Sequence, residues 1–101
     1  MRMLLNITFP HEPFNTFVRD GSAGQKLGRI IDEVKPEAIY FTEKDAGRGA
    51  VMIVEVSDPS MVPALAEPWF LTFNAQVEFR VVMSTADLQK AALDDIGKKW
   101  G

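Results

Sequence analysis

Several polar side chains are spaced so that they fall on one face of a predicted β-sheet: Asn6, Tyr40, Glu55, Glu78 and Arg80. Glu55 and Glu78 could form a carboxylate pair, with one member protonated, that transfers a proton to or from a bound molecule. Arg80 could hold an anionic group through its guanidinium. Glu78 and Arg80 stand two residues apart on one strand, a spacing that also suits an ordinary ion pair. We predict that this set binds a ligand, and the catalytic role of the two glutamates stays open.

His11 is the only histidine in the chain, and it follows the first predicted strand. A histidine can exchange protons near neutral pH, so His11 is a further candidate for a general base. Its position between Pro10 and Pro13 favours the alternative, a solvated loop residue without a catalytic role. His11 and Glu12 supply too few ligands for a histidine metal site, and the chain has no cysteine, so we expect no metal and no cofactor. Whether the protein is an enzyme stays open.

These candidates depend on four predicted strands. Side-chain alternation predicts strands at Met3–Phe9 and Gln76–Met83, and apolar β-like runs predict the two between them at Glu37–Glu43 and Ala50–Val56. The turn-rich segment Lys44–Gly49 joins the middle two strands into a hairpin. Both strands of this hairpin carry apolar residues on both faces, whereas a half-exposed strand should alternate apolar with polar residues. We therefore expect the second face of the sheet to be covered by another part of the protein or by a second copy.

The first helical region is predicted as a short helix that breaks near Gly21, followed by a longer helix that starts at Ser22. Ser22 and Gln25 fit a capping box, in which each side chain accepts a backbone N–H of the other residue. Pro36 ends the longer helix, because the residue before a proline disfavours helical geometry.

The second helical region contains Pro63 and Pro68, which predict a short or kinked helix. Its buried anchors are expected to be Leu65, Trp69 and Phe73 at helical spacing. After the fourth strand, Ser84 and Asp87 are predicted to cap one last helix. The apolar stripe of that helix is Leu88, Ala91, Ala92 and Ile96.

The order β-α-β-β-α-β with an extra C-terminal helix predicts an α+β, ferredoxin-like domain over residues 1–101. A four-stranded antiparallel sheet would carry its helices on one face. The other face would hold Leu4, Asn6, Thr8, Ala38, Tyr40, Thr42, Val51, Ile53, Glu55, Gln76, Glu78, Arg80 and Val82. This set is too apolar for water and too polar for a dry core, which favours two copies stacked through their open faces around a partly polar cavity.

Composition limits the class of protein further. With 47% hydrophobic and 25% charged residues, the chain suits a folded protein and not a disordered one. The net charge of -3 gives no basic field for nucleic acid. The absence of cysteine fits a reducing compartment, and no apolar run approaches the about 20 residues that span a bilayer, so we expect a cytoplasmic protein without a membrane partner.

An RNA-recognition domain is an alternative, because such domains share this topology. Arg48–Glu55 begins like their eight-residue signature, with a basic residue followed by glycine. The positions that should carry stacking aromatics hold Ala50, Met52 and Glu55 instead. Without rings to stack on bases, the signature loses its physical basis.

Three short segments carry a resemblance to known proteins: Lys35–Phe41, Ala66–Phe70 and Asn74–Glu78. They are similar to segments of small bacterial proteins of unassigned function, over most of residues 1–92. The element order and the two-faced sheet resemble the dimeric α+β barrel superfamily, which includes small monooxygenases, muconolactone isomerase-like enzymes and stress-responsive barrels. The resemblance implies a homodimeric barrel with a pocket. It carries over no catalytic residue, because the superfamily has no shared catalytic motif.

We therefore expect a homodimer that binds a small, partly anionic organic molecule in the cavity between its two sheets. The alternative is a self-association or regulatory module that has the same dimer interface but no ligand and no chemistry. The apolar residues of the open face fit both hypotheses equally well.

Overall fold

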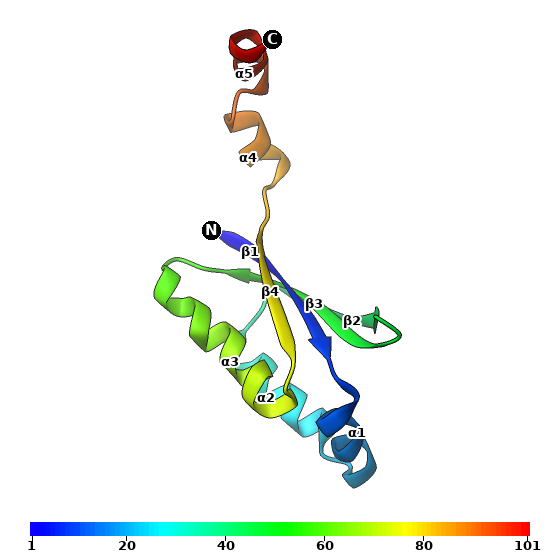
Figure 1. The fold of residues 1–101 in the computed structure, drawn as a ribbon. Coiled ribbons are helices and arrows are strands. Elements are labelled where there is room, and N and C mark those ends of the chain that lie inside the picture. Colours follow the sequence, from blue (N-terminus) through cyan, green and yellow to red (C-terminus); the bar gives the residue numbers. More distant parts are fainter.

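The computed structural model, which describes residues 1–101, has a four-stranded antiparallel sheet with helices packed on one face (Figure 1). The elements are β1 (Arg2–Phe9), α1 (His11–Asp20), α2 (Ala23–Val34), β2 (Ala38–Lys44), β3 (Gly47–Glu55), the 3-10 helix η1 (Pro59–Met61), α3 (Val62–Phe73), β4 (Gln76–Val81), α4 (Thr85–Lys90) and α5 (Leu93–Trp100). The strands are ordered β2-β3-β1-β4. The α+β class and the antiparallel sheet are confirmed, and the arrangement is consistent with a ferredoxin-like fold.

The core lies between the sheet and the helices. Alternate residues of β1, including Leu5, Ile7 and Phe9, point toward the helices and are buried. An aromatic cluster centres on Phe73, whose ring centroid lies 5.3 Å from that of Phe9 and 5.0 Å from that of Phe14. The predicted anchors of α3, namely Leu65, Trp69 and Phe73, are all buried, as helical spacing required.

Pro68 does not end or interrupt its helix, since α3 continues through it over 12 residues; whether the helix bends there, as its sequence predicts, stays a prediction. A proline inside a helix leaves the carbonyl four residues earlier without its usual partner. That carbonyl belongs to Ala64, which is exposed and can be hydrated. Burial of the α3 anchors on the sheet outweighs the lost hydrogen bond.

The capping box predicted at the start of α2 is wrong. Ser22 precedes the helix, but its backbone is already helical, with φ -96° and ψ -7°, and its side chain makes no capping hydrogen bond. Its N–H donates instead to the Asp20 carboxylate at 2.9 Å. Gly21, at φ 82°, turns the chain between α1 and α2, and this local geometry determines where Ser22 points.

The hairpin turn is also shorter than predicted. Lys44 pairs with Gly47, so only Asp45 and Ala46 lie in the loop, and Gly47 to Gly49 belong to β3. Both loop residues have positive φ, 52° and 58°, the combination that defines a type I′ turn. The glycines that suggested a loop instead serve the strand, where they permit close packing.

The C-terminal part differs most from the prediction. The strand ends at Val81, and two helices follow instead of one, because Ala92 adopts a left-handed φ of 56° between α4 and α5. The predicted Ser84–Asp87 capping box is confirmed, with N–H to oxygen distances of 3.0 Å and 3.1 Å. We call Met83–Gly101 the C-terminal arm.

The C-terminal arm projects from the end of the sheet, beyond the N-terminus of β1 (Figure 1). Every one of its residues is exposed. The radius of gyration, 17.1 Å, exceeds the about 13 Å typical of a compact chain of this length. The arm therefore contributes nothing to the core, and the sheet with α1 to α3 forms the packed body.

Candidate functional site

The open face, which is the face of the sheet opposite the helices, carries the predicted polar residues. The strand register places Asn6 opposite both Val51 and Glu78, and Val51 opposite Tyr40. The next row along the strands joins Ala38, Ile53, Leu4 and Arg80. These residues share one face, in agreement with the alternation of the sequence.

The open face is uncovered and divided in character. Leu4, Val51 and Ile53 on the two central strands are only partly buried, and Tyr40 on the edge strand β2 is 69% exposed. The charged pair Glu78 and Arg80 lies on β4, at the opposite edge, whereas Glu55 lies at the end of β3. An apolar half therefore lies beside a polar half on one continuous surface.

A polar hollow of about 400 Å³ lies at the end of the open face where β1 finishes. Its lining residues come from β1, β4, the last residue of β2 and the β2–β3 turn, and are Asn6, Thr8, Lys44, Asp45, Gln76, Val77 and Glu78. The amide and hydroxyl groups can both donate and accept hydrogen bonds, and Lys44 is the sole cationic side chain of the lining. The lining also contains the Asp45 and Glu78 carboxylates, so the hollow suits a small polar molecule that presents its anionic group to Lys44 and N–H or O–H donors to the two carboxylates.

Lys44 owes its position to Gly49 of β3, which lies diagonally across the hairpin, two residues beyond the register partner Gly47. A Cβ added to Gly49 would lie 2.8 Å from Lys44 Cβ and 3.1 Å from the Ile7 carbonyl oxygen. Both distances are shorter than ordinary van der Waals contact, so only glycine leaves room there. Sequence reasoning missed Lys44 as a binding residue because it assigned Gly49 to a loop.

Arg80 is already paired with a neighbour and does not line the polar hollow. Its guanidinium donates to the Glu78 carboxylate at 2.8 Å, and both side chains are more than half exposed. An exposed pair of this kind contributes only about 0–1 kcal/mol to stability, so a ligand could replace it at small cost. Of the predicted ligand-binding set, only Asn6 and Glu78 line the hollow.

Glu55 and Glu78 do not form a carboxylate pair within one subunit. Glu55 is opposite Arg2 of β1, whereas Glu78 is opposite Asn6, four residues further along that strand and on its other side. Strand spacing and rise place the two residues about 16 Å apart. Glu55 instead pairs with the amino group of Met1. The alternation placed both glutamates on one face, but only the register revealed their separation.

His11 lies at the exposed start of α1, outside the open face. It lines a neighbouring hollow of about 570 Å³, which shares Thr8, Lys44, Asp45 and Gln76 with the polar hollow. Glu12 does not join it there; the Thr16 hydroxyl donates to Glu12 at 2.6 Å and holds the pKa of that carboxyl below its usual range. The chain gathers no three acidic, histidine or cysteine side chains into a potential metal site.

Comparison with known proteins finds no matching family model and no matching curated protein. None of the helices combines the length and apolar character needed to cross a membrane. We therefore infer the function from the geometry of the open face and the polar hollow.

Proposed function

We propose that this chain forms a ferredoxin-like homodimer through its open face, in the manner of dimeric α+β barrels, and binds a small anionic organic molecule in the polar hollow. The observation that carries the proposal is the hollow itself, which collects amide, hydroxyl, ammonium and carboxylate groups at the end of the open face. Binding sites combine a few convergent polar groups with apolar walls, and in the stacked dimer the apolar half of the two faces would supply such walls. No reaction follows from the arrangement.

The homodimer is favoured by the apolar half of the open face. Full burial of an exposed apolar side chain contributes roughly 1.5–3 kcal/mol, and the partly buried Leu4, Val51 and Ile53 would each gain a fraction of this, before the cost of association. A second copy of the face presents the same residues and is self-complementary under two-fold symmetry. The stacked sheets would also exclude water from the polar hollow and strengthen the attraction between Lys44 and an anionic group, together with the repulsion of that group by Asp45 and Glu78.

Self-association without a ligand is the second candidate. Two observations favour it: Glu78 is paired with Arg80, and Glu55 with the Met1 amine, so these charged residues have partners in the absence of any ligand. The open face would then serve only for self-association, through its apolar half.

Titration with sodium benzoate, followed by ¹⁵N–¹H NMR, separates the two candidates. Benzoate has a carboxylate on a small apolar body, and benzamide is its neutral counterpart of similar shape. We expect saturable shifts at Asn6, Thr8 and Gln76 with benzoate and weaker binding of benzamide. Lys44→Met should weaken benzoate binding about tenfold, equivalent to about 1.4 kcal/mol. Lys90→Met, on the C-terminal arm, is the matched control and should leave binding unchanged.

Light scattering at micromolar concentration tests the dimer in the same samples. A stable monomer would contradict the homodimer. A dimer that shows no saturable shift with benzoate, or whose shifts are insensitive to Lys44→Met, would contradict the anion site and leave self-association as the function.

A further inference from the structure

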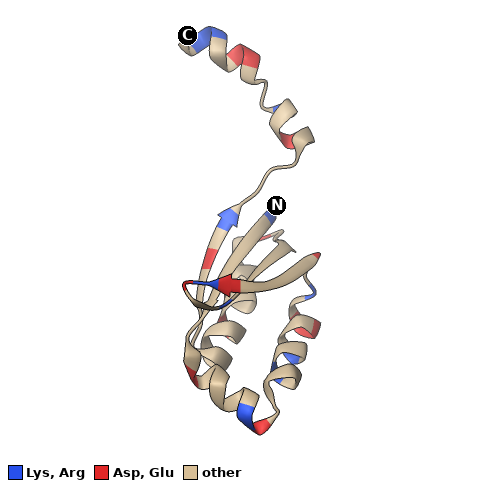
Figure 2. Ribbon diagram, turned by 90° about the vertical axis from the view of Figure 1, so that its right-hand side faces the viewer, with Lys and Arg blue, Asp and Glu red and all other residues tan.

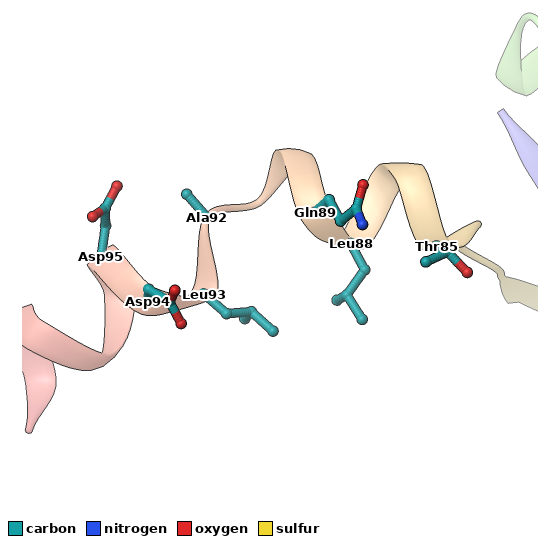
Figure 3. A pocket seen from close by; sticks show the side chains of 7 residues that line it. All are labelled: Thr85, Leu88, Gln89, Ala92, Leu93, Asp94 and Asp95. Atoms are coloured by element: carbon teal, nitrogen blue, oxygen red, sulfur yellow. The ribbon is translucent and has the colours of Figure 1, made fainter.

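The C-terminal arm carries an apolar stripe that nothing in the chain covers. Leu93, Ile96 and Trp100 stand at helical spacing on α5 and are 55%, 45% and 78% exposed. Leu88 on α4 extends the stripe, and Figure 3 shows the Leu88 and Leu93 side chains on the same side of the arm. A shallow hollow of about 470 Å³ lies beside Leu88 and Leu93.

Helices as short as these require a packing partner. α4 has 6 residues and α5 has 8, whereas isolated helices below about 12–15 residues are marginal in water. The capping box at Ser84 and Asp87 helps α4, but α5 begins at the left-handed Ala92 without a side-chain cap. The arm is therefore expected to become fully helical when its apolar stripe is covered.

A matching uncovered surface lies on the outer side of the helical layer. A groove of about 630 Å³ runs between α2 and α3. Its lining residues are Phe17, Lys26, Arg29, Ile30, Glu33, Ala64, Glu67, Pro68, Leu71 and Thr72. Leu71, at its edge, is 82% exposed, which is unusually high for a leucine beside other apolar groups.

The charges of the groove complement those of α5. Lys26 and Arg29 lie toward the start of α2, and Glu33 lies toward its end. Glu67 of α3 adds a second carboxylate to the lining of the groove. α5 has the opposite order, since it starts with Asp94 and Asp95 and ends with Lys98 and Lys99. Figure 2 shows these acidic and basic bands at the tip of the arm. An α5 helix laid parallel to α2 would face each charged end with the opposite charge.

We infer that the C-terminal arm of one copy docks into the α2–α3 groove of a second copy, and that the second arm returns the contact. The arm extends away from its own helices, and the longest dimension of the molecule is 59 Å, which places the apolar stripe where another copy can meet it (Figures 1 and 2). Reciprocal exchange satisfies two-fold symmetry. The inference rests on the homodimer proposed above but involves neither the open face nor the polar hollow.

Cysteine cross-linking tests the contact, because the chain has no native cysteine. Chains with Ile96→Cys are mixed with larger, tagged chains that carry Leu71→Cys and are then oxidised. We expect a disulfide-linked heterodimer on a non-reducing gel. The matched control replaces Leu71→Cys by Val18→Cys, another exposed apolar position that does not line the groove. Equal cross-linking to both positions would overturn the inference.

A chain that carries Ile96→Cys and Leu71→Cys together distinguishes the second copy from docking within one molecule. A disulfide-linked dimer supports exchange. A monomer with an internal disulfide, recognised by faster migration, would overturn it.

Charge exchange provides an independent measurement in the uncross-linked protein. Reversal of Asp94 and Asp95 to lysine should raise the dimer dissociation constant at least tenfold, and added reversal of Lys26 and Arg29 to glutamate should restore it. Val51→Glu, on the open face, is measured in parallel. If the arm variants dissociate as the wild type does while Val51→Glu separates the copies, the exchanged arm is excluded and the proposed open-face dimer stands. If no variant alters the dissociation constant, both interfaces are excluded.

Discussion

Gly49→Ala is the substitution whose effect the structure defines most closely. The added methyl group would lie 2.8 Å from Lys44 Cβ and 3.1 Å from the carbonyl oxygen of Ile7. Ile7 belongs to the central strand β1 and is fully buried, so its backbone cannot retreat without disturbing the core. The remaining way to relieve the clash is a displacement of β2, which carries Lys44.

Gly47→Ala is the matched control in the same strand. A methyl group there would lie 3.6 Å from the Lys44 carbonyl oxygen and 3.7 Å from His11 Cε1, which are ordinary contacts. Both substitutions restrict the unfolded chain and gain about 0.4–1 kcal/mol from that effect. Overpacking at Gly49 opposes this gain by about 1–3 kcal/mol. The difference between the two variants therefore isolates the clash.

Urea unfolding at one fixed protein concentration measures this difference, since a dimer would make stability depend on concentration. With a slope of about 2 kcal/mol per molar urea, a difference of about 2 kcal/mol separates the two midpoints by about 1 M. The Gly49→Ala midpoint should be the lower, and benzoate binding should weaken because Lys44 is displaced. Equal midpoints would refute the argument that close packing at Gly49 positions Lys44.

Two further predictions concern local geometry. Ala46→Gly should raise the free energy of unfolding by about 1 kcal/mol, because alanine is strained at φ 58° in the type I′ turn and glycine is not; an unchanged or lower urea midpoint would contradict this. Hydrogen bonds from the Ser60 side chain and backbone N–H hold the pKa of Asp58 below its usual value in the folded protein. The ionised Asp58 therefore stabilises the fold above about pH 4, and this contribution is lost as the pH falls through the lowered pKa of the folded state. Asp58→Asn, which keeps the acceptor but does not titrate, should therefore lose less stability than the wild type between about pH 4 and pH 2; identical losses in acid-range unfolding curves would argue against the role of Asp58.

Local chemistry made several features predictable. Alternation of side chains identified the strands and the two faces of the sheet, because successive residues of a strand point to opposite sides. Helical spacing identified Leu65, Trp69 and Phe73 as buried anchors. The Ser84–Asp87 box was recognisable because its two hydrogen bonds join residues three apart and need no other part of the chain.

Other local signals failed where distant contacts decided the outcome. Pro68 by itself disfavours a helix, yet Leu65 before it and Trp69 after it are both buried, and their packing keeps the helix continuous. The glycines after Ala46 predicted a loop, but in the structure strand pairing continues as far as Gly47, which pairs with Lys44. In both segments, packing or pairing with another element outweighed the local conformational preference of the proline or glycine.

The sequence by itself determined which side chains share the open face, because alternation requires only neighbouring residues. Tertiary structure alone decided which of them are close, because strand register is set by long-range pairing. It separated Glu55 from Glu78 and brought Lys44, at the end of β2, close to Asn6 and Gln76 of two other strands. It also left the C-terminal arm without a partner in its own chain.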